Sequence, residues 1–445
     1  MSFSAGILRQ TLAELGELAA RANRYVVAFS GGLDSTVLTH ALADICKDAD
    51  TELFAVYVDH GLQRESAHWS EHCEAFAMSL GIAFAGLRVA VDLQSGLGLE
   101  AAAREARYSA FRDLVEPDDW LVSAHHRDDQ AETVLLNLMR GSGPAGLAGI
   151  QPVRRFSSGW LVRPLLDVAR EDLQAYATRH SLEWLVDPSN LDQQFDRNYL
   201  RHEVLPRFES RWPDAANRIR RSAKLAGEAA GLLRELAEMD AQAFGDRPDR
   251  LPIDALIALQ PARQRNVLRH IIFELGLPLP GATHLRQIID EVVHAREDAQ
   301  PLVAWPGGRA RRHDKKLYLL PADDLQAKPK SGLRFTGDKL ALGGGLGKLR
   351  LRTGVPTGLS DAVIEAGLEL RFRVGGEKIR PTGQEHTRKV KKLLQEENIV
   401  PWMRDRIPLL FAGDELVAVA DLWVADGAAS SPGTAIEWIN RPAIH

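Results

Sequence analysis

The sequence is poor in cysteine, and this scarcity excludes several kinds of protein. Only Cys46 and Cys73 occur among 445 residues, and they are not arranged as Cys-x-x-Cys. A disulfide framework needs several cysteine pairs and a structural zinc site needs clustered ligands, so neither is expected. Both cysteines fall on apolar faces of predicted helices, where buried packing is the expected role. Enzymes that insert sulfur usually depend on paired or catalytic cysteines, which this chain lacks.

Long apolar runs are also missing. No stretch approaches the ~20 apolar residues that cross a bilayer, and the first ten residues contain no basic segment followed by an apolar one. The chain is therefore expected to be cytoplasmic and to have no membrane partner. Its 45% hydrophobic and 26% charged residues are typical of a globular protein. Because 445 residues exceed what one core can hold, two or three domains are expected.

A net positive charge is absent as well. The chain has 55 Lys and Arg against 60 Asp and Glu, a formal charge of −5. Non-specific binding of nucleic acid is disfavoured, so any RNA contact must be local. Residues 196–224 hold eight Lys and Arg against four acids, and residues 371–408 hold ten against five. Solvated helix faces give similar counts, so charge alone leaves both interpretations open.

The most informative stretch is residues 26–36, VVAFSGGLDST. An apolar strand runs into a glycine turn, and a helix with an apolar face follows. Gly31 and Gly32 can adopt backbone angles closed to other residues and leave the amides uncovered, while the serine hydroxyls add donors. The helix directs its positive end at the same place, so the turn is suited to phosphate. No Gly-Lys-Ser/Thr is present, which excludes an ordinary Walker A loop.

Strands and helices alternate over the following hundred residues. Strands are predicted at 53–58, 83–89 and 120–123, separated by helices near 66–80, 97–114 and 129–139. This alternation predicts an α/β fold with a parallel, doubly wound sheet. Ligands of such sheets lie beyond the carboxyl ends of the strands, where the strand order reverses. Polar residues follow three strands, at 30–35, 59–61 and 124–129.

The rest of the chain has a different pattern. Residues 213–297 predict an all-helical segment, and a β-hairpin is expected after it, with strands at 303–305 and 317–320. Residues 321–332 have linker composition. The expected division is a first domain at 1–212, a mainly helical domain at 213–325, and a small α+β C-terminal domain at 333–445.

A second polar segment, HHRDDQAET at residues 125–133, follows a strand and begins a helix. Asp129 and Glu132 lie on one face of the first helical turn. They could hold Mg²⁺ or receive the proton of an incoming amine. Helix capping is the alternative for these acids, and a zinc site at His125 and His126 lacks a clear third ligand.

Taken together, these segments resemble the tRNA(Ile)-lysidine synthetases, a family of the PP-loop ATP pyrophosphatases. SGGLDS at residues 30–35 resembles the PP-loop, and HHRDDQAET resembles the family's second signature. Further matching segments are VDHGL at 58–62, EAAAREARY at 100–108, RNYLR at 197–201, and GGE, IRP and KKLLQE within 371–406. The likeness therefore covers both ends of the chain. It implies that the domain at 1–212 is a PP-loop catalytic domain, that the domain at 213–325 contacts tRNA and that the domain at 333–445 binds tRNA.

The resemblance implies ATP and Mg²⁺ as cofactors, and free L-lysine and a tRNA(Ile) with a CAU anticodon as substrates. ATP would adenylylate the C2 oxygen of the wobble cytidine with release of pyrophosphate, and the lysine amine would then expel AMP to form lysidine. Resemblance and residue chemistry together assign ATP binding to Ser30, Gly31, Gly32, Leu33, Asp34 and Ser35, catalysis to Asp34, Arg104, Arg107, Asp129 and Glu132, Mg²⁺ to Asp34, and RNA contact to Arg197, Arg201, Arg380, Arg388, Lys391 and Lys392.

Two other functions are compatible with a PP-loop. One is a tRNA sulfurtransferase, which the cysteine pattern disfavours. The other is a non-catalytic module that binds ATP or RNA, which the paired acids after the fourth strand disfavour. The sequence leaves open which residues bind lysine, which acid meets the metal, and whether the chain forms a homodimer.

Overall fold

The computed structural model describes residues 2–17, 19, 22–47, 49, 51–61, 66–92, 94, 98–296, 299–322, 331–335 and 337–444. Contacts group the chain into two compact units, Met1–Leu232 and Leu233–His445. The division falls within one 27-residue helix, α10 (Ala215–Ala241). The three-domain division expected from the sequence is finer than this one and stays a prediction.

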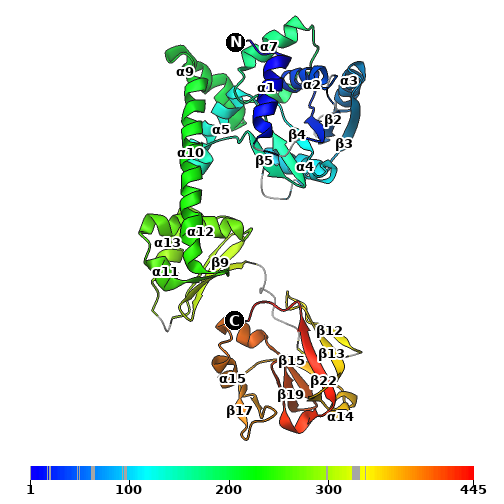
Figure 1. Ribbon diagram of the computed structural model, residues 1–445, viewed down its shortest axis with the longest axis vertical. Coiled ribbons are helices and arrows are strands. Elements are labelled where there is room, and N and C mark those ends of the chain that lie inside the picture. The colour runs from blue at the N-terminus through cyan, green and yellow to red at the C-terminus, as the bar shows by residue number, and fades with distance from the viewer. Residues whose placement is uncertain are drawn as a thin grey trace. The chain divides into compact units, whose positions relative to one another are not determined.

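The first unit is built around a six-stranded sheet with the order β3-β2-β1-β4-β6-β5 (Figure 1). Its strands are β1 Arg24–Ala28, β2 Glu52–Asp59, β3 Ala83–Arg88, β4 Trp120–Val122, β5 Val153–Phe156 and β6 Gly159–Val162. Neighbouring strands are parallel, except that β5 and β6 form an antiparallel hairpin. The predicted α/β fold with a largely parallel sheet is confirmed.

Helices cover both faces of this sheet. They are α1 Ala5–Gly16, α2 Leu33–Cys46, α3 Ser66–Ser79, α4 Leu99–Leu114, α5 Arg127–Met139, α6 Pro144–Leu147 and α7 Arg170–Arg179. Successive strand residues point to opposite faces: Val27 and Val122 pack into the layer that contains α1, α2, α3 and α7, whereas Val26 and Leu121 pack against α4. The sheet is therefore doubly wound.

The elements expected from periodicity differ from the observed ones by at most two residues at either end. The hairpin of β5 and β6 has no counterpart among the predicted strands. Its turn is made by Ser157 and Ser158, and Ser157 has φ +51°, a conformation that usually signals glycine. The first unit ends in short helical segments: a turn at Pro188–Leu191, α8 Asp196–Tyr199, a π-helical turn at Leu200–Val204, and α9 Leu205–Arg211.

The second unit begins with helices on a small antiparallel sheet of order β7-β10-β9-β8. Its helices are α11 Ile253–Ile257, α12 Pro261–Glu274 and α13 Ala282–Gln287, continued by a π-helical turn at Ile288–Val293. Its strands are β7 Arg250–Pro252, β8 Leu302–Trp305, β9 Gly308–His313 and β10 Lys316–Pro321. The expected all-helical segment at 213–297 is wrong at β7, which pairs with β10.

The predicted hairpin is wrong in its partner strand. After a turn at Pro306 and Gly307, β8 pairs with β9, which separates β8 from β10. In the sequence GRARRH of β9 only Gly308 and Ala310 are buried, while the arginines and the histidine lie at the partly exposed surface. This density of charge hides a strand from any prediction based on apolar content.

The remainder of the second unit holds two five-stranded antiparallel sheets, of order β11-β15-β18-β19-β20 and β12-β13-β22-β14-β21. The strands are β11 Leu333–Arg334, β12 Lys339–Ala341, β13 Lys348–Val355, β14 Gly358–Leu359, β15 Glu369–Phe372, β18 Pro408–Ala412, β19 Glu415–Val419, β20 Trp423–Val424, β21 Ala429–Ser430 and β22 Gly433–Ile439, with a separate pair, β16 Lys378–Ile379 and β17 Arg388–Lys389. The helices are α14 Asp361–Glu365 and α15 Val390–Glu396. Residues 323–330 of the expected linker lie outside the described residues.

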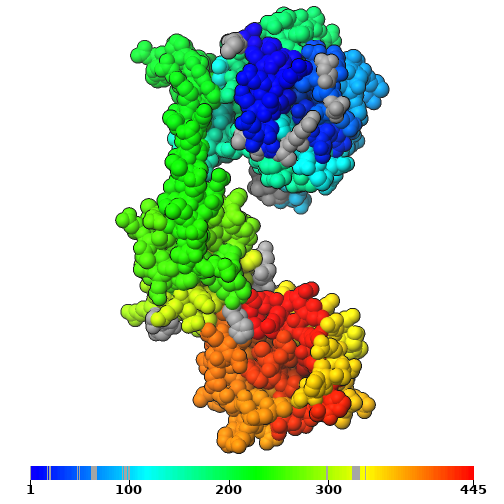
Figure 2. Space-filling view, viewed as in Figure 1, coloured from blue at the N-terminus to red at the C-terminus, as the bar shows by residue number. Residues whose placement is uncertain are grey.

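Helix α10 carries an apolar stripe that is not part of a core. Leu225, Leu232 and Met239 are exposed, and the space-filling view shows a length of this helix uncovered (Figure 2). Exposed leucines at helical spacing do not mark a membrane segment here: no helix in the described ranges has the length and apolar character that spanning a bilayer requires.

Candidate active site

Two polar segments meet where the strand order of the main sheet reverses. Strands β1 and β4 are parallel neighbours. After β1 the chain adds β2 and β3 on one side of the sheet, and after β4 it adds β5 and β6 on the other side. Residues 30–35 follow β1 and residues 124–129 follow β4, so both segments lie at the carboxyl ends of adjacent strands. This is the place where open α/β sheets bind ligands.

The glycine turn after β1 is held by its own hydroxyl groups. Gly31 has φ +76°, and Gly32 is the residue that caps the start of α2. The hydroxyl of Ser35 lies 3.0 Å from the carbonyl oxygen of Gly32, 3.3 Å from the amide of Ser30 and 3.1 Å from its hydroxyl. Because Gly32 contributes no capping side chain, the first amides of α2 are available to an anion.

The outer side of the turn packs against the protein interior. The amide of Leu185 donates to the carbonyl oxygen of Gly31 at 2.8 Å. A Cβ atom at Gly31 would lie 2.8 Å from Leu185 Cδ1 and 2.9 Å from Cys73 Sγ. A Cβ atom at Gly32 would meet only the Ser30 hydroxyl, at an ordinary 3.6 Å. The two glycines therefore have different structural roles.

This difference gives a paired prediction. Gly31→Ala should destabilise the first unit by about 1–3 kcal/mol, because the added methyl group meets a positive φ and two close side-chain atoms. Gly32→Ala should stay within about 0.5 kcal/mol of the wild type, since its φ of −74° suits alanine. Urea unfolding of both variants measures this. Equal stability of the two variants would contradict the packing described for Gly31.

His126 connects the acids of the two segments. It caps the start of α5 and is only 1% exposed. Its Nε2 lies 3.5 Å from a carboxylate oxygen of Asp34 and 3.3 Å from one of Asp129, and its Nδ1 lies 3.3 Å from one of Asp128. Burial opposes charge on the ring, but Asp129, Asp128 and Asp34 outweigh burial and raise the pKa of His126 to about 10. The ring is therefore an imidazolium at neutral pH.

The Nδ1 atom of His126 has two neighbours with opposite demands. The amide of Asp128 lies 3.2 Å from Nδ1, and Nδ1 can accept a hydrogen bond from this amide only when the ring is neutral. The carboxylate of Asp128 lies 3.3 Å from the same atom, where a protonated ring donates. Carboxylates around both nitrogens favour the protonated form, so the ion pair prevails over the capping bond.

The protonation of His126 sets a pH dependence of stability. Its pKa is about 10 in the folded protein and ~6.5 in an unfolded chain. The folded state holds this proton more tightly, so the stabilisation is complete below pH ~6.5 and is lost as the pH rises towards 10. We expect the free energy of unfolding to fall by a few kcal/mol over this window in the wild type, and much less in His126→Asn. Urea titrations at a series of pH values measure the two slopes, and parallel slopes would argue against the charged ring.

His125, the neighbouring residue, is in the opposite state. Burial is the main cause that lowers its pKa to about 3, and the positive charges of Arg163, Arg197 and Arg104 lower it further, against the effect of Asp129. Its Nδ1 lies 2.9 Å from the hydroxyl of Ser123. Adjacent histidines thus provide one neutral and one charged ring.

Asp129 and Glu132 are both paired with arginines. The Nε atoms of Arg197 and Arg201 each lie 2.6 Å from Glu132, and their Nη2 atoms lie 3.2 and 3.1 Å from Asp129. Glu132 is fully buried. Burial raises the pKa of Asp129, but His126 and Arg197 outweigh burial and lower it to about 2. The structure brings these four predicted residues into one ion-pair network.

The arginines of α4 point to different neighbours. Arg104 is exposed and lies over the ring of Tyr108, 4.9 Å from its centroid. Arg107 lies 3.0 Å from Nε2 of His60, which follows β2. Burial and the charge of Arg107 lower the pKa of His60 to about 4, so the ring is neutral. Leu62, in the same predicted motif as His60, lies outside the described residues.

The predicted RNA contacts of the second unit are in a different setting. Arg380 pairs with Asp426 at 2.6 Å, and Arg388 pairs with Glu396. Lys391 and Lys392 are exposed on α15 and form no ion pair within the described part of the chain. The first unit holds the twelve other predicted site residues, and the second unit holds these four.

Asp34 has the features of a cation ligand. Its Oδ1 atom is buried and has no hydrogen-bond partner among the described residues. Carboxylate oxygens suit Mg²⁺, which usually takes one or two of them together with the phosphates of a nucleotide. A site made by the protein alone is not evident, since the described residues contain no group of three His, Cys, Asp or Glu that could hold a metal ion.

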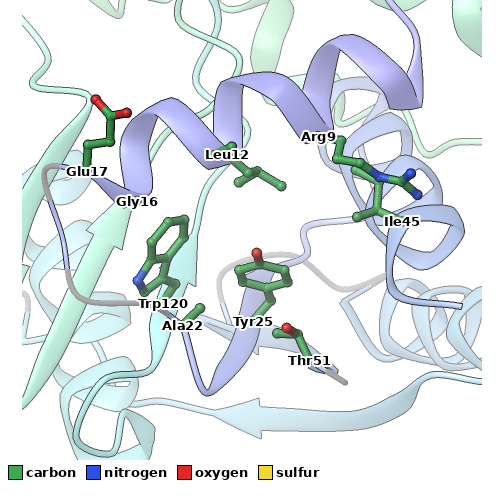
Figure 3. Close-up of a pocket in the computed structure, with 10 residues that line it drawn as sticks. Arg9, Leu12, Gly16, Glu17, Ala22, Tyr25, Ile45, Thr51 and Trp120 are labelled. Carbon is green, nitrogen blue, oxygen red and sulfur yellow. The ribbon is translucent and has the colours of Figure 1, made fainter. Parts of the chain in front are cut away.

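A cavity of about 450 Å³ lies elsewhere in the first unit, between α1 and the sheet (Figure 3). It is lined by Leu12 of α1, by Tyr25 near the start of β1 and by Trp120 at the start of β4. The starts of parallel strands share the edge opposite to their carboxyl ends. None of the predicted site residues lines this cavity, so it is distinct from the candidate active site.

Comparison with known proteins identifies the class first. A protein-family model described as the PP-loop domain matches residues 6–208, the range that holds the glycine turn and the ion-pair network. The chain thus contains the ATP-binding domain of the PP-loop class. Two further models, described as the TilS substrate binding domain and the TilS substrate C-terminal domain, match residues 251–318 and 368–438.

Curated relatives identify the family. A tRNA(Ile)-lysidine synthase of Coxiella burnetii is 41% identical over 406 residues, covering 91% of this chain and 90% of that protein. The tRNA(Ile)-lysidine synthase of Alkalilimnicola ehrlichii is 42% identical, covering 95% of this chain and 95% of that protein. That of Xanthomonas campestris is also 42% identical, covering 89% of this chain and 90% of that protein. This chain belongs to the tRNA(Ile)-lysidine synthase family and is an enzyme of that type.

The role of His126 was not found from the sequence, where it stood out only as a zinc candidate. One signal was available in the sequence. His126 and Asp129 are three residues apart, which is the spacing of the N-cap and N3 residues in a helix capping box. The amide of His126 does donate to Asp129 at 2.9 Å. The contact with Asp34 left no such signal, since 92 positions of the sequence separate the two residues.

Proposed function

We propose that this enzyme joins free L-lysine to C2 of the wobble cytidine of a tRNA(Ile) with a CAU anticodon, at the expense of ATP. The C2 oxygen of cytidine is a poor leaving group. Its attack on the α-phosphate of ATP releases pyrophosphate and leaves an adenylated base. The neutral ε-amine of lysine then attacks C2, AMP departs with the oxygen, and lysidine is formed.

The observation that carries this proposal is the meeting of the glycine turn with the ion-pair network, in a chain of this family. The turn and the amides at the start of α2 would hold the departing pyrophosphate. Mg²⁺, when bound with ATP, neutralises phosphate charge, and Asp34 would be its ligand from the protein. His126, 3.5 Å away, would keep Asp34 oriented.

We assign Asp129 and Glu132 a positioning role. A carboxylate whose pKa is about 2 is a poor base near neutral pH, so Asp129 is unsuited to take the proton of the amine. Both acids instead hold the guanidinium groups of Arg197 and Arg201, which are 26% exposed. These arginines supply fixed positive charge to the phosphate of the adenylated base. Their direct contact with tRNA stays a prediction.

Labelled lysine provides the test. With ATP, Mg²⁺ and a transcript of tRNA(Ile) bearing CAU, the purified enzyme should transfer label to RNA, and release of pyrophosphate should depend on the transcript. The same transcript with UAU, which has no wobble cytidine, is the control and should remain unlabelled. Pyrophosphate release without any transfer of lysine would contradict the proposed second step.

The structure does not favour sulfur transfer. The thiolate is the reactive form of cysteine, and burial raises the pKa of Cys46 to about 11 and that of Cys73 to about 12. Cys73 is fully buried behind the glycine turn. No other cysteine occurs in the sequence. A cytoplasmic location and the homodimer stay predictions.

Lys391 and Lys392 on α15 are proposed to hold the tRNA backbone. Replacing both with alanine should weaken tRNA binding and lower the slope of log affinity against log salt by roughly 1.4–1.8, because each phosphate contact releases ~0.7–0.9 counterions. Filter binding at several salt concentrations measures the slope. Lys339→Ala, which removes an exposed lysine from β12, is the matched control. An unchanged slope in the double variant would place the RNA contact elsewhere.

A further inference from the structure

Arg163 is a buried arginine at the active-site edge of the sheet to which no role has been assigned. It directly follows β6, the neighbour of β4, and is only 4% exposed. Its Nη1 donates to the carbonyl oxygen of Gln151 at 2.6 Å. Its Nε is buried and has no hydrogen-bond partner within the described residues. A charged side chain in this setting lacks part of the compensation that buried groups normally find.

The surroundings of Arg163 are positive. Arg163 forms no ion pair with a carboxylate of the described ranges, and burial together with the charges of Arg154 and Arg104 lowers its pKa. The guanidinium groups of Arg104 and Arg154 lie 4.9 and 5.7 Å from the centroid of the Tyr108 ring. Three arginines thus surround one tyrosine. A protein retains such unbalanced charge where an anion supplies the balance.

Tyr108 adds a hydroxyl group to this cluster. Its oxygen accepts a hydrogen bond from Nη2 of Arg104 at 3.4 Å, and Tyr108 is among the groups that raise the pKa of Arg163, against the effect of burial. Since arginine can only donate, the oxygen is the acceptor and the hydroxyl proton is available to another acceptor. The ring itself is fixed against Phe111 and Phe156. The cluster offers an anion both charge and oriented donors.

The cluster lies beside the reaction centre. Arg163 and Arg104 are among the charges that lower the pKa of His125, the residue that begins the segment after β4, and Arg197 of the ion-pair network is another. In the sheet, β4 lies between β1 and β6. The phosphate-binding turn and Arg163 are therefore separated by two interstrand spacings, roughly 10 Å. A molecule of the length of lysine fits within this span.

We propose that Arg163, together with Arg104 and Tyr108, binds the α-carboxylate of the lysine substrate. The Nη1 side of the guanidinium is engaged by Gln151, which leaves the Nε side for a carboxylate oxygen. The depth of Arg163 suits a small anion at the end of a flexible substrate. A backbone phosphate of tRNA would more readily meet the exposed Arg154. This inference rests on the proposed function and names the subsite of one substrate.

A comparison of two amines tests the subsite. 1,5-Diaminopentane carries the same amine chain as lysine and has no carboxylate. Arg163→Gln should raise the KM for lysine by roughly 10–100-fold, the value of a charge-assisted hydrogen bond. Its kinetics with 1,5-diaminopentane and its KM for ATP should be unchanged, so the preference of the wild type for lysine should largely vanish. Arg155→Gln, an exposed arginine of the same hairpin that stacks on Trp160, is the control and should keep the preference.

Three outcomes are distinguishable. If Arg163→Gln keeps the wild-type preference for lysine and instead raises the KM for ATP or tRNA, the anion is a phosphate and the subsite is wrong. If the variant does not fold, Arg104→Gln removes an exposed member of the cluster and should reduce the preference by itself; an unchanged preference would then reject the proposal. If the wild type transfers neither amine to RNA, the proposed function fails, whatever the role of Arg163.

Discussion

Replacing Asp34 with alanine is expected to lower the rate of tRNA adenylylation by about 10²–10³-fold, because the Mg²⁺ that neutralises phosphate charge would lose its ligand from the protein. The carboxylate lies in the first turn of α2, its Oδ2 is 3.5 Å from the His126 ring, and its Oδ1 is free to meet a cation. Pyrophosphate release that depends on tRNA, measured with saturating ATP, reports this step. Binding of tRNA should change little.

The control for Asp34 lies on the same helix. Asp44→Ala removes an exposed acid that pairs with Lys47 and should leave adenylylation at the wild-type rate. If Asp34 is a ligand of Mg²⁺, its loss should also raise the Mg²⁺ concentration needed for half-maximal rate. A slow variant with an unchanged Mg²⁺ requirement would mean that Asp34 acts through His126 and not through the metal.

Replacing Glu132 with alanine is expected to destabilise the first unit by about 3–5 kcal/mol, because removing one partner leaves buried charges without compensation. Glu132 is fully buried and accepts from the Nε atoms of Arg197 and Arg201, each at 2.6 Å. Only Asp129 would remain to balance two guanidinium groups. The midpoint of urea unfolding, followed by a signal from the first unit, gives this free energy.

An exposed ion pair provides the comparison. Asp167 is 78% exposed and pairs with Arg220, so Asp167→Ala should cost about 0–1 kcal/mol. Glu132→Gln retains the shape of the side chain, so its loss in free energy of unfolding should lie between those of Asp167→Ala and Glu132→Ala. If Glu132→Ala unfolds at the same urea concentration as Asp167→Ala, the network at Glu132 contributes no more than a surface pair. Activity measured at low temperature, where the variant stays folded, separates positioning from stability.

Much of the fold could be predicted because its signals are local. A short stretch of consecutive residues is enough to specify each apolar strand, each helix of the first unit and the glycine turn at Gly31. Local signals fail where a strand departs from its usual composition. Strand β9 carries three arginines, and the turn of β5 and β6 uses serine at a positive φ, so neither matches the common pattern.

The candidate site shows the same division. The sequence by itself predicted that a glycine turn suited to phosphate and an acidic segment each follow a strand of one parallel sheet, whose carboxyl ends share an edge; the structure showed that these strands, β1 and β4, are neighbours. Only the tertiary structure decided the charges: His126 is protonated because acids from two segments surround it, and Asp129 is held ionised by His126 and by Arg197, which is 68 positions away. Protonation and pairing depend on distances of a few ångströms between residues remote in sequence, and packing alone sets those distances.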